Sequence, residues 1–189
     1  MTQFETERLI LRPMTAADHD ALADMIFDPQ VVAYLRYRRV QSPAAFEQLF
    51  TTHFLADTTT VFGIERRRDH QLIGFYEFHG SGATGELTYA LSPAAWGHGY
   101  VAEAGNCLMH YGFETLNYET IEAHYASANP NSGRVMAKMG MQAAGELHTF
   151  TSDKGEVIHV MRYLLTKATW RQLSAWPETR FSSYTKIVA

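Results

Sequence analysis

The sequence predicts a mixed α/β fold, in which a mostly antiparallel sheet carries helices on both faces. Two observations predict it. Short β-like runs joined by tight turns require antiparallel pairing, and one strand–helix–strand segment, residues 86–125, implies a parallel pair through a right-handed crossover. The expected order β-α-α-β-β-β-α-β-α-β-β is not the strict alternation of a doubly wound sheet.

The first third of the chain predicts one strand and two helices. Residues 8–12 read as a strand that a proline ends. Thr15, with Asp18 three residues later, predicts a near-complete capping box at the start of the first helix. Ser42 followed by proline predicts the start of the second helix. The aromatic and basic segment 34–39 between the helices has no clear assignment.

The rest of the chain alternates strand and helix signals. The expected elements are a hairpin of strands 61–64 and 72–78, strand 86–91, helix 100–114, strand 120–125, helix 133–139 and a last hairpin of strands 145–150 and 157–165. Ser132 precedes a predicted helix and is a favoured N-cap residue. The tail carries aromatic residues that either cover the core of the same chain or pack on a partner: Trp170, Trp176, Phe181 and Tyr184.

Composition limits the class of protein. The 189 residues show no compositional break, so we expect a single domain, 1–189, with its core at about 5–165 and a C-terminal extension at 166–189. An apolar content of 46% is enough for a real core. The net charge of −4 argues against a nucleic-acid binder, which usually has a basic face.

Several kinds of site and location are not expected. One cysteine, Cys107, excludes an internal disulfide framework, and the nine histidines show no metal-ligand spacing, so no metal site is predicted. No apolar run reaches the length of a membrane span, and the first residues lack the pattern of a signal peptide. We therefore expect a cytoplasmic protein without membrane contact.

The most informative stretch is Trp96-Gly97-His98-Gly99-Tyr100-Val101, between a predicted strand and a predicted helix. Two glycines let backbone N–H groups point at one spot without Cβ obstruction, and the helix end adds partial positive charge. Such a loop can hold an anion such as a pyrophosphate. The alternative is a tight turn that needs glycine only for its backbone angles.

Around this loop the sequence resembles the GNAT superfamily of acyl-CoA-dependent N-acetyltransferases, in particular the RimJ/RimL-type branch. The resemblance runs from residue 5 to about residue 165. It rests on the opening run ETERLILR at 5–12, ELTYALSP at 86–93, WGHGYVAEA at 96–104, YGF at 111–113, NPNSGRV at 129–135 and KMGM at 138–141. Each fragment is modest, but their order and spacing together are specific.

The resemblance implies a splayed sheet in which acyl-CoA lies between the two parallel strands. Its pyrophosphate would lie on the backbone of the glycine loop, and the pantetheine arm would follow the first of the two strands. The implied CoA-binding residues are Leu87, Tyr89, Leu91, Trp96, Gly97, His98, Gly99, Tyr100, Val101, Ala102, Asn129 and Ser132. Asn129 matches the position that touches pantetheine, and Ser132 the position near the thioester sulfur.

Acetyl transfer to an amine needs a base for the amine and a group that stabilises the leaving thiolate. Glu86 is the first candidate for the base, because this family often places a glutamate there that acts through water. Its alternative reading is a solvent-facing strand residue. Glu77, His79 and His148 are further candidates for the base. Ser132 is the candidate acid or thiolate stabiliser, and its alternative reading is a helix cap.

The predicted function is transfer of an acetyl group from acetyl-CoA to a primary amine, either a protein N-terminus or a small molecule. An alternative is a catalytically idle acyl-CoA-binding or regulatory module on the same fold. A dinucleotide binder is disfavoured, because the full glycine fingerprint is absent. Glu103 and Cys107 read as structural residues. Family members are often monomers or homodimers, and the sequence leaves this choice open.

Overall fold

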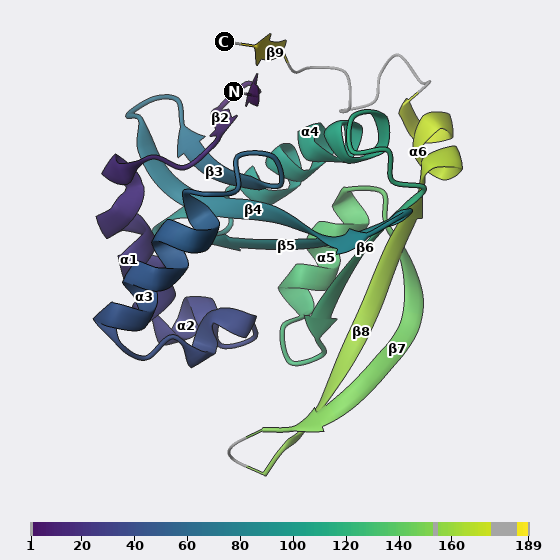
Figure 1. The fold of residues 1–189 in the computed structure, drawn as a ribbon. Helices are drawn as coiled ribbons and strands as arrows, with labels where there is room; N and C mark the ends of the chain where they lie inside the picture. The colour runs from purple at the N-terminus through teal and green to yellow at the C-terminus, as the bar shows by residue number, and fades with distance from the viewer. Residues whose placement is uncertain (1, 153–154, 175–184, 189) are drawn as a thin grey trace. The chain divides into compact units, whose positions relative to one another are not determined.

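The computed structural model describes residues 2–152, 155–174 and 185–188. They fall into two compact units. The first unit holds residues 2–77, 89–104 and 185–188, and the second holds 78–88, 105–152 and 155–174. Strands β4 (Gln71–Ser81) and β5 (Thr84–Leu91) and helix α4 (Tyr100–Glu114), labelled in Figure 1, contribute residues to both units. No helix among the described residues is long and apolar enough to cross a membrane. The expectation of one domain stays a prediction.

The first unit is a sheet with strand order β9-β1-β2-β3-β4-β5. Its other strands are β1 (Thr2–Glu5), β2 (Leu9–Arg12), β3 (Val61–Arg66) and β9 (Thr185–Val188), and those from β9 to β4 pair antiparallel. Its helical segments are η1 (Ala16–Asp18), α1 (His19–Phe27), α2 (Pro29–Val32), η2 (Arg36–Arg39), α3 (Pro43–Leu49), η3 (Phe50–Phe54) and η4 (Pro93–Ala95). Strand β1 was not predicted, and segment 34–39 contains the short helix η2.

Both helix starts that the sequence predicts in the first unit are confirmed. The Asp18 carboxylate accepts hydrogen bonds from the Thr15 backbone N–H (2.7 Å) and hydroxyl (2.9 Å). The Ser42 hydroxyl accepts one from the Ala45 backbone N–H (3.2 Å). These side chains satisfy amide groups that a helix start leaves without partners, so local sequence decided where each helix begins.

The core of the first unit is an apolar cluster between α1, α3, η3 and the strands. Its fully buried members include Leu22, Met25, Ile26, Phe46, Phe50, Phe54, Val61 and Phe75. Helices α1 and α3 lie side by side (Figure 1), and the His19 ring contacts Phe46 with the ring centres 5.2 Å apart. Phe54 packs edge-on against Phe75 of β4 at 5.2 Å. Phe46, Phe50 and Phe54 therefore form the core face of α3 and η3.

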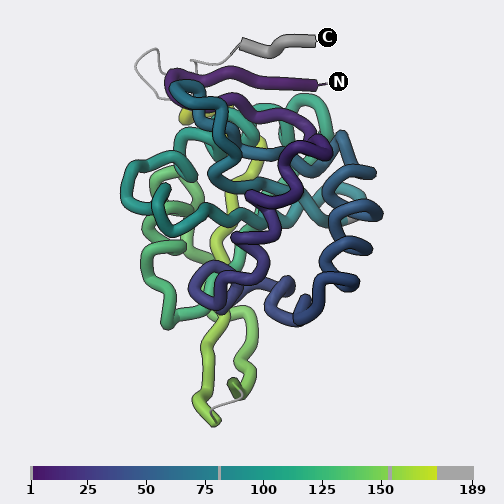
Figure 2. Tube along the Cα trace, turned by 90° about the vertical axis from the view of Figure 1, so that its left-hand side faces the viewer, coloured from purple at the N-terminus to yellow at the C-terminus, as the bar shows by residue number. Residues whose placement is uncertain are grey.

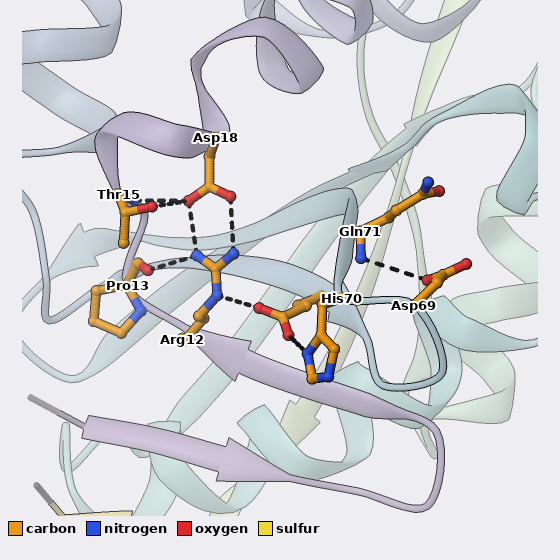
Figure 3. Close-up of polar contacts among 8 residues, drawn as sticks. Arg12, Pro13, Thr15, Asp18, Asp69, His70 and Gln71 are labelled. Atoms are coloured by element: carbon orange, nitrogen blue, oxygen red, sulfur yellow. Dashed lines mark hydrogen bonds and ion pairs between the residues drawn. The ribbon is translucent and has the colours of Figure 1, made fainter.

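An ion cluster joins the start of the first helix to strands β2 and β3 (Figure 3). Arg12 donates two hydrogen bonds to Asp18 (2.7 and 2.8 Å) and one to Glu65 (2.5 Å), and His70 Nδ1 lies 2.6 Å from Glu65. Burial acts to raise the pKa of Asp18, but the hydrogen bonds from Arg12 and Thr15 outweigh it and lower the pKa. Asp18 thus caps a helix and pairs with a cation at once.

The second unit has the strand order β4-β5-β6-β8-β7, with β6 (Thr120–Ala126), β7 (Gln142–Thr151), β8 (Val157–Thr166), α5 (Pro130–Lys138) and α6 (Lys167–Ser174). β5 and β6 pair parallel, and α4 connects them, which confirms the predicted crossover. β7 and β8 pair antiparallel as a long two-stranded ribbon (Figures 1 and 2), which confirms the last predicted hairpin. The predicted mixed fold with mostly antiparallel pairing and one parallel pair is confirmed.

Helix α4 packs closely on β6 in the second unit. A Cβ added at Gly112 would lie 2.7 Å from Ile121 Cδ1, so only glycine allows this approach. Cys107 is buried, and burial raises its pKa to about 12. The thiol is therefore a packing group, as the sequence predicts.

One predicted boundary in the second unit was wrong. Helix α5 begins at Pro130 rather than at residue 133, so Asn129 occupies the N-cap position and Ser132 lies inside the first turn. Proline has the backbone angle of a first helical residue, which favours the earlier start. In the tail, Trp170 of α6 is buried against Phe113 with ring centres 5.3 Å apart, so it covers the core of its own chain. The other tail aromatics, Trp176, Phe181 and Tyr184, lie outside the described residues.

Candidate active site

The predicted site residues occur in both units. The first unit carries Tyr89, Leu91 and the glycine loop with its flanks, Trp96, Gly97, His98, Gly99, Tyr100, Val101 and Ala102. The second unit carries Glu86, Leu87, Asn129 and Ser132. Each unit therefore holds a separate group of the predicted residues: the glycine loop in the first and Glu86, Leu87, Asn129 and Ser132 in the second.

The glycine loop has the backbone that its sequence predicts. Gly97 and Gly99 have φ angles of 80° and 79°, in the left-handed region that favours glycine. A Cβ added at Gly97 would meet no atom within 4 Å. The glycines are therefore required by the backbone angles, and the space in front of Gly97 is open.

The carbonyl groups of this loop are held by other residues of the first unit. Arg8 Nη1 donates to the His98 carbonyl (2.9 Å), the Glu103 backbone N–H to the Gly99 carbonyl (3.1 Å), and the Tyr76 hydroxyl to the Val101 carbonyl (2.7 Å).

Among the described residues, the backbone hydrogen bonds outside helices and strands include none donated by the N–H groups of Gly97, His98 or Gly99. Backbone amides that precede a helix start, with the neighbouring carbonyls tied back, are suited to an anion.

The residues that flank the loop are arranged by packing. The Trp96 indole N–H donates to the Leu91 carbonyl (2.9 Å), which fixes the ring beside the end of β5, yet the residue is 46% exposed. Tyr89 packs against Tyr76 with the ring centres 5.1 Å apart. Leu91 is buried, so its side chain belongs to the core of the first unit. An exposed ring whose polar atom is already bonded offers an apolar surface next to the amides.

Strands β5 and β6 pair only over a short stretch. Within the described residues, Thr84–Glu86 of β5 pair with Thr120–Glu122 of β6, and the pairing ends at Glu86. β6 nevertheless continues to Ala126 and stays paired with β8 as far as that residue. The last parallel pair is thus Glu86 opposite Glu122, and the side chain of Leu87, the next residue of β5, is buried.

Glu86 belongs to a cluster of charged side chains on β5, β6 and β8. His124 Nδ1 lies 3.5 Å from Glu86 Oε1, and His124 Nε2 lies 3.5 Å from Glu122 Oε1. Arg162 Nη1 lies 3.9 Å from the other oxygen of Glu122. The interaction with Glu86 is the largest cause that raises the pKa of His124, and it outweighs the opposing effect of burial. The Glu86 side chain is 44% exposed, so its carboxylate is open to solvent.

His124 was not among the predicted site residues. The alternation of strand 120–125 places Glu122 and His124 on one face of the strand. This pattern is the sequence feature that could have identified His124. Ile121 and Tyr125, on the other face, pack against α4 and α5, since Cβ atoms added at Gly112 and Gly133 would meet these two side chains. The charged cluster therefore occupies the face away from these two helices.

Asn129 and Ser132 bracket the start of α5 in the second unit. Both side chains are partly buried, and the Ser132 backbone N–H donates to the Asn129 carbonyl (3.1 Å). Ser132 is thus in the first turn of a nine-residue helix, where the helix dipole favours negative charge. A thiolate next to Ser132 would be stabilised by the helix dipole and by a hydrogen bond from the Ser132 hydroxyl.

Glu77, the second candidate for the base, has a different environment. Its side chain is fully buried in the first unit. It accepts hydrogen bonds from the Tyr37 hydroxyl (2.7 and 2.8 Å) and Arg36 (3.3 Å), and His53 Nε2 lies at 2.7 Å. Burial, followed by the charge of Glu77, raises the pKa of Tyr37 far above its ordinary value. The sequence did not predict this cluster, because its members lie up to 41 residues apart.

The remaining candidates for the base, His79 and His148, lie on other strands. His79 lies on β4 within the second unit, and His148 is exposed on β7, opposite Val160 of β8. The described residues hold no group of three or more His, Cys, Asp or Glu side chains that could bind a metal ion.

The sequence matches the family model described as acetyltransferase (GNAT) domain over residues 8–142. The uncharacterized N-acetyltransferase p20 of Bacillus licheniformis is 30% identical over 173 residues, which cover 88% of this chain and 97% of that protein.

Two crystal structures share the fold. An acetyltransferase (GNAT family) from Bacillus anthracis superposes with a TM-score of 0.78 at 23% identity, over 88% of this chain and 99% of that one. The spermidine N-acetyltransferase from Vibrio cholerae, in complex with CoA and spermine, has a TM-score of 0.76 at 21% identity, over 86% and 98%.

Proposed function

The chain belongs to the GNAT acetyltransferase family, and on this basis we propose that it transfers an acetyl group from acetyl-CoA directly to a primary amine. The observation that carries the proposal is the glycine loop. Its residues Gly97, His98 and Gly99 are exposed, its carbonyls are tied back, and its glycines have left-handed backbone angles. This backbone suits the pyrophosphate of CoA, and acetyl-CoA supplies the activated acetyl group.

We assign the general base to Glu86. A half-exposed carboxylate can take a proton from an ammonium group through water, whereas a fully buried one cannot reach it. His124 Nδ1 lies 3.5 Å from the Glu86 carboxylate, and this interaction raises the pKa of His124. Ser132 is assigned to stabilise the leaving thiolate by hydrogen bonding, supported by its place in the first turn of α5.

The other CoA contacts follow from the family resemblance. Leu87, Tyr89 and Leu91 would follow the pantetheine arm along β5, and Asn129 would touch it. The acceptor is a primary amine of a protein N-terminus or of a small molecule. The RimJ/RimL-type branch stays a prediction, as does a monomeric or dimeric state.

The proposal is tested by measuring thiol release from acetyl-CoA with the purified chain and a panel of amines. The panel includes spermine, because a fold neighbour was crystallised with it, and short peptides with free N-termini. We expect saturable thiol release with at least one amine. CoA binding without turnover across the panel would favour the idle acyl-CoA-binding module, and a chain that does not bind CoA would contradict the proposal.

A further inference from the structure

Arg8 reaches the glycine loop from the segment just before strand β2. Its guanidinium donates through Nη1 to the His98 carbonyl (2.9 Å) and lies 4.7 Å from the centre of the Tyr100 ring. Its Nη2 atom would be 3.7 Å from a Cβ added at Gly99. The cation is therefore placed against three consecutive residues of the loop, although neither the loop motif nor the predicted site includes it.

Glu103 holds Arg8 in this position. Its Oε2 atom accepts from Arg8 Nε (2.7 Å) and lies 2.6 Å from Arg8 Nη2, which is the side-on, two-donor geometry of arginine. Its Oε1 atom accepts from the Arg8 backbone N–H (2.9 Å) and the Thr6 hydroxyl (2.5 Å). The Glu103 side chain is 17% exposed, so this carboxylate is largely screened from water.

A carboxylate in this place has two opposing effects. In the first turn of α4 it stabilises the helix dipole. Beside amides that bind an anion, the same charge repels the anion, and low exposure strengthens the repulsion. Arg8 removes this conflict because it neutralises Glu103 and also ties back the His98 carbonyl.

We infer that Arg8 is a positioning residue for the diphosphate of acetyl-CoA, acting with Glu103 as a neutral pair that shapes and electrically screens the loop. The inference rests on the proposed function. It predicts that the cost of losing Arg8 comes largely from the uncovered charge of Glu103. A purely structural role predicts the opposite: removal of both partners would be at least as harmful as removal of one.

The test measures CoA affinity by calorimetry for the wild-type chain, Arg8→Ala, Arg8→Lys and the double variant Arg8→Ala/Glu103→Gln. Arg8→Ala is expected to weaken CoA binding about tenfold, because one charged hydrogen-bonded partner is lost while the other stays. The double variant is expected to bind CoA at least about threefold more tightly than Arg8→Ala does. Arg8→Lys keeps the charge without the two-donor fork and is expected to lie between wild type and Arg8→Ala.

The matched control is Arg171→Ala, alone and with Glu114→Gln, which breaks an exposed arginine–glutamate pair at the last residue of the same helix. We expect wild-type CoA affinity from both control variants. Arg8→Ala with unchanged affinity, or a double variant no better than Arg8→Ala, would overturn the inference. If Arg8→Ala does not fold, as judged by its thermal transition, Arg8→Lys at wild-type affinity overturns it. A wild-type chain that does not bind CoA overturns the proposed function, and the inference with it.

Discussion

Two glutamates on consecutive strands, Glu77 in the first unit and Glu86 in the second, have opposite environments. Glu77 is fully buried and accepts hydrogen bonds from Tyr37 and Arg36, with His53 at 2.7 Å. Glu86 is 44% exposed and has an imidazole 3.5 Å away. The Glu77 carboxylate is therefore a buried hydrogen-bond acceptor within the first unit, whereas the Glu86 carboxylate can take a proton from solvent.

The difference shows that the residue type alone does not make a glutamate a general base; its environment decides. A buried carboxylate depends on every hydrogen bond around it, since the loss of water must be offset. An accessible carboxylate keeps its contact with water and can exchange a proton with it. Variants of these two glutamates should therefore separate stability from catalysis.

The largest expected effect is on stability. Glu77→Ala leaves the Tyr37 hydroxyl and the side chains of His53 and Arg36 without their shared acceptor, so we expect the free energy of unfolding to fall by about 3–5 kcal/mol. Urea denaturation of the purified chain measures it. Glu86→Ala, the matched variant on β5, removes only a partly exposed ion pair and should change this free energy by no more than about 1 kcal/mol. Equal losses for the two variants would remove the distinction between the two sites.

The next effect is on catalysis. Glu86→Gln keeps the shape of the side chain but cannot accept a proton, so kcat should fall about 100-fold with little change in CoA affinity. Steady-state rates with the best amine of the panel measure the change. Glu146→Gln is the control, because it alters another glutamate paired with a histidine, His159, on the β7–β8 ribbon. Wild-type turnover in Glu86→Gln would send the base role to another residue.

The smallest effect is on the pH dependence of stability. The folded pKa of His124 is raised above its ordinary value of 6.5, so its ion pairs with Glu86 and Glu122 stabilise the fold fully below pH 6.5. This contribution is lost as the pH rises above 6.5 through the raised pKa. Arg162, on β8, faces the same cluster and opposes the shift.

We therefore expect His124→Gln to cost up to about 1 kcal/mol at pH 6 and less at pH 9, measured by denaturation at each pH. His159→Gln on β8 gives the baseline for loss of a paired imidazole. A cost for His124→Gln that grows with pH would contradict the sign of this prediction.

The sequence predictions succeeded where a feature depends on residues close together in the chain, and failed where it depends on distant segments. The caps at Thr15 and Ser42 are encoded within three residues, and both were confirmed. The start of α5 was misplaced at residue 133, since Pro130, four residues after the end of β6, outweighed the serine signal. The polar partners of Glu77 come from segments 24 to 41 residues away, so no local pattern could identify them.

By itself the sequence determined the order of strands β2 to β8 and of helices α1, α3, α4 and α5, the parallel crossover and the glycine loop, because periodicity, caps and left-handed angles are local properties. Tertiary structure alone decided which glutamate is buried, that His124 lies beside Glu86, and that Arg8 and Glu103 meet at the loop. Burial and charge pairing depend on residues brought together from distant segments, and these contacts set the free-energy cost of each charge.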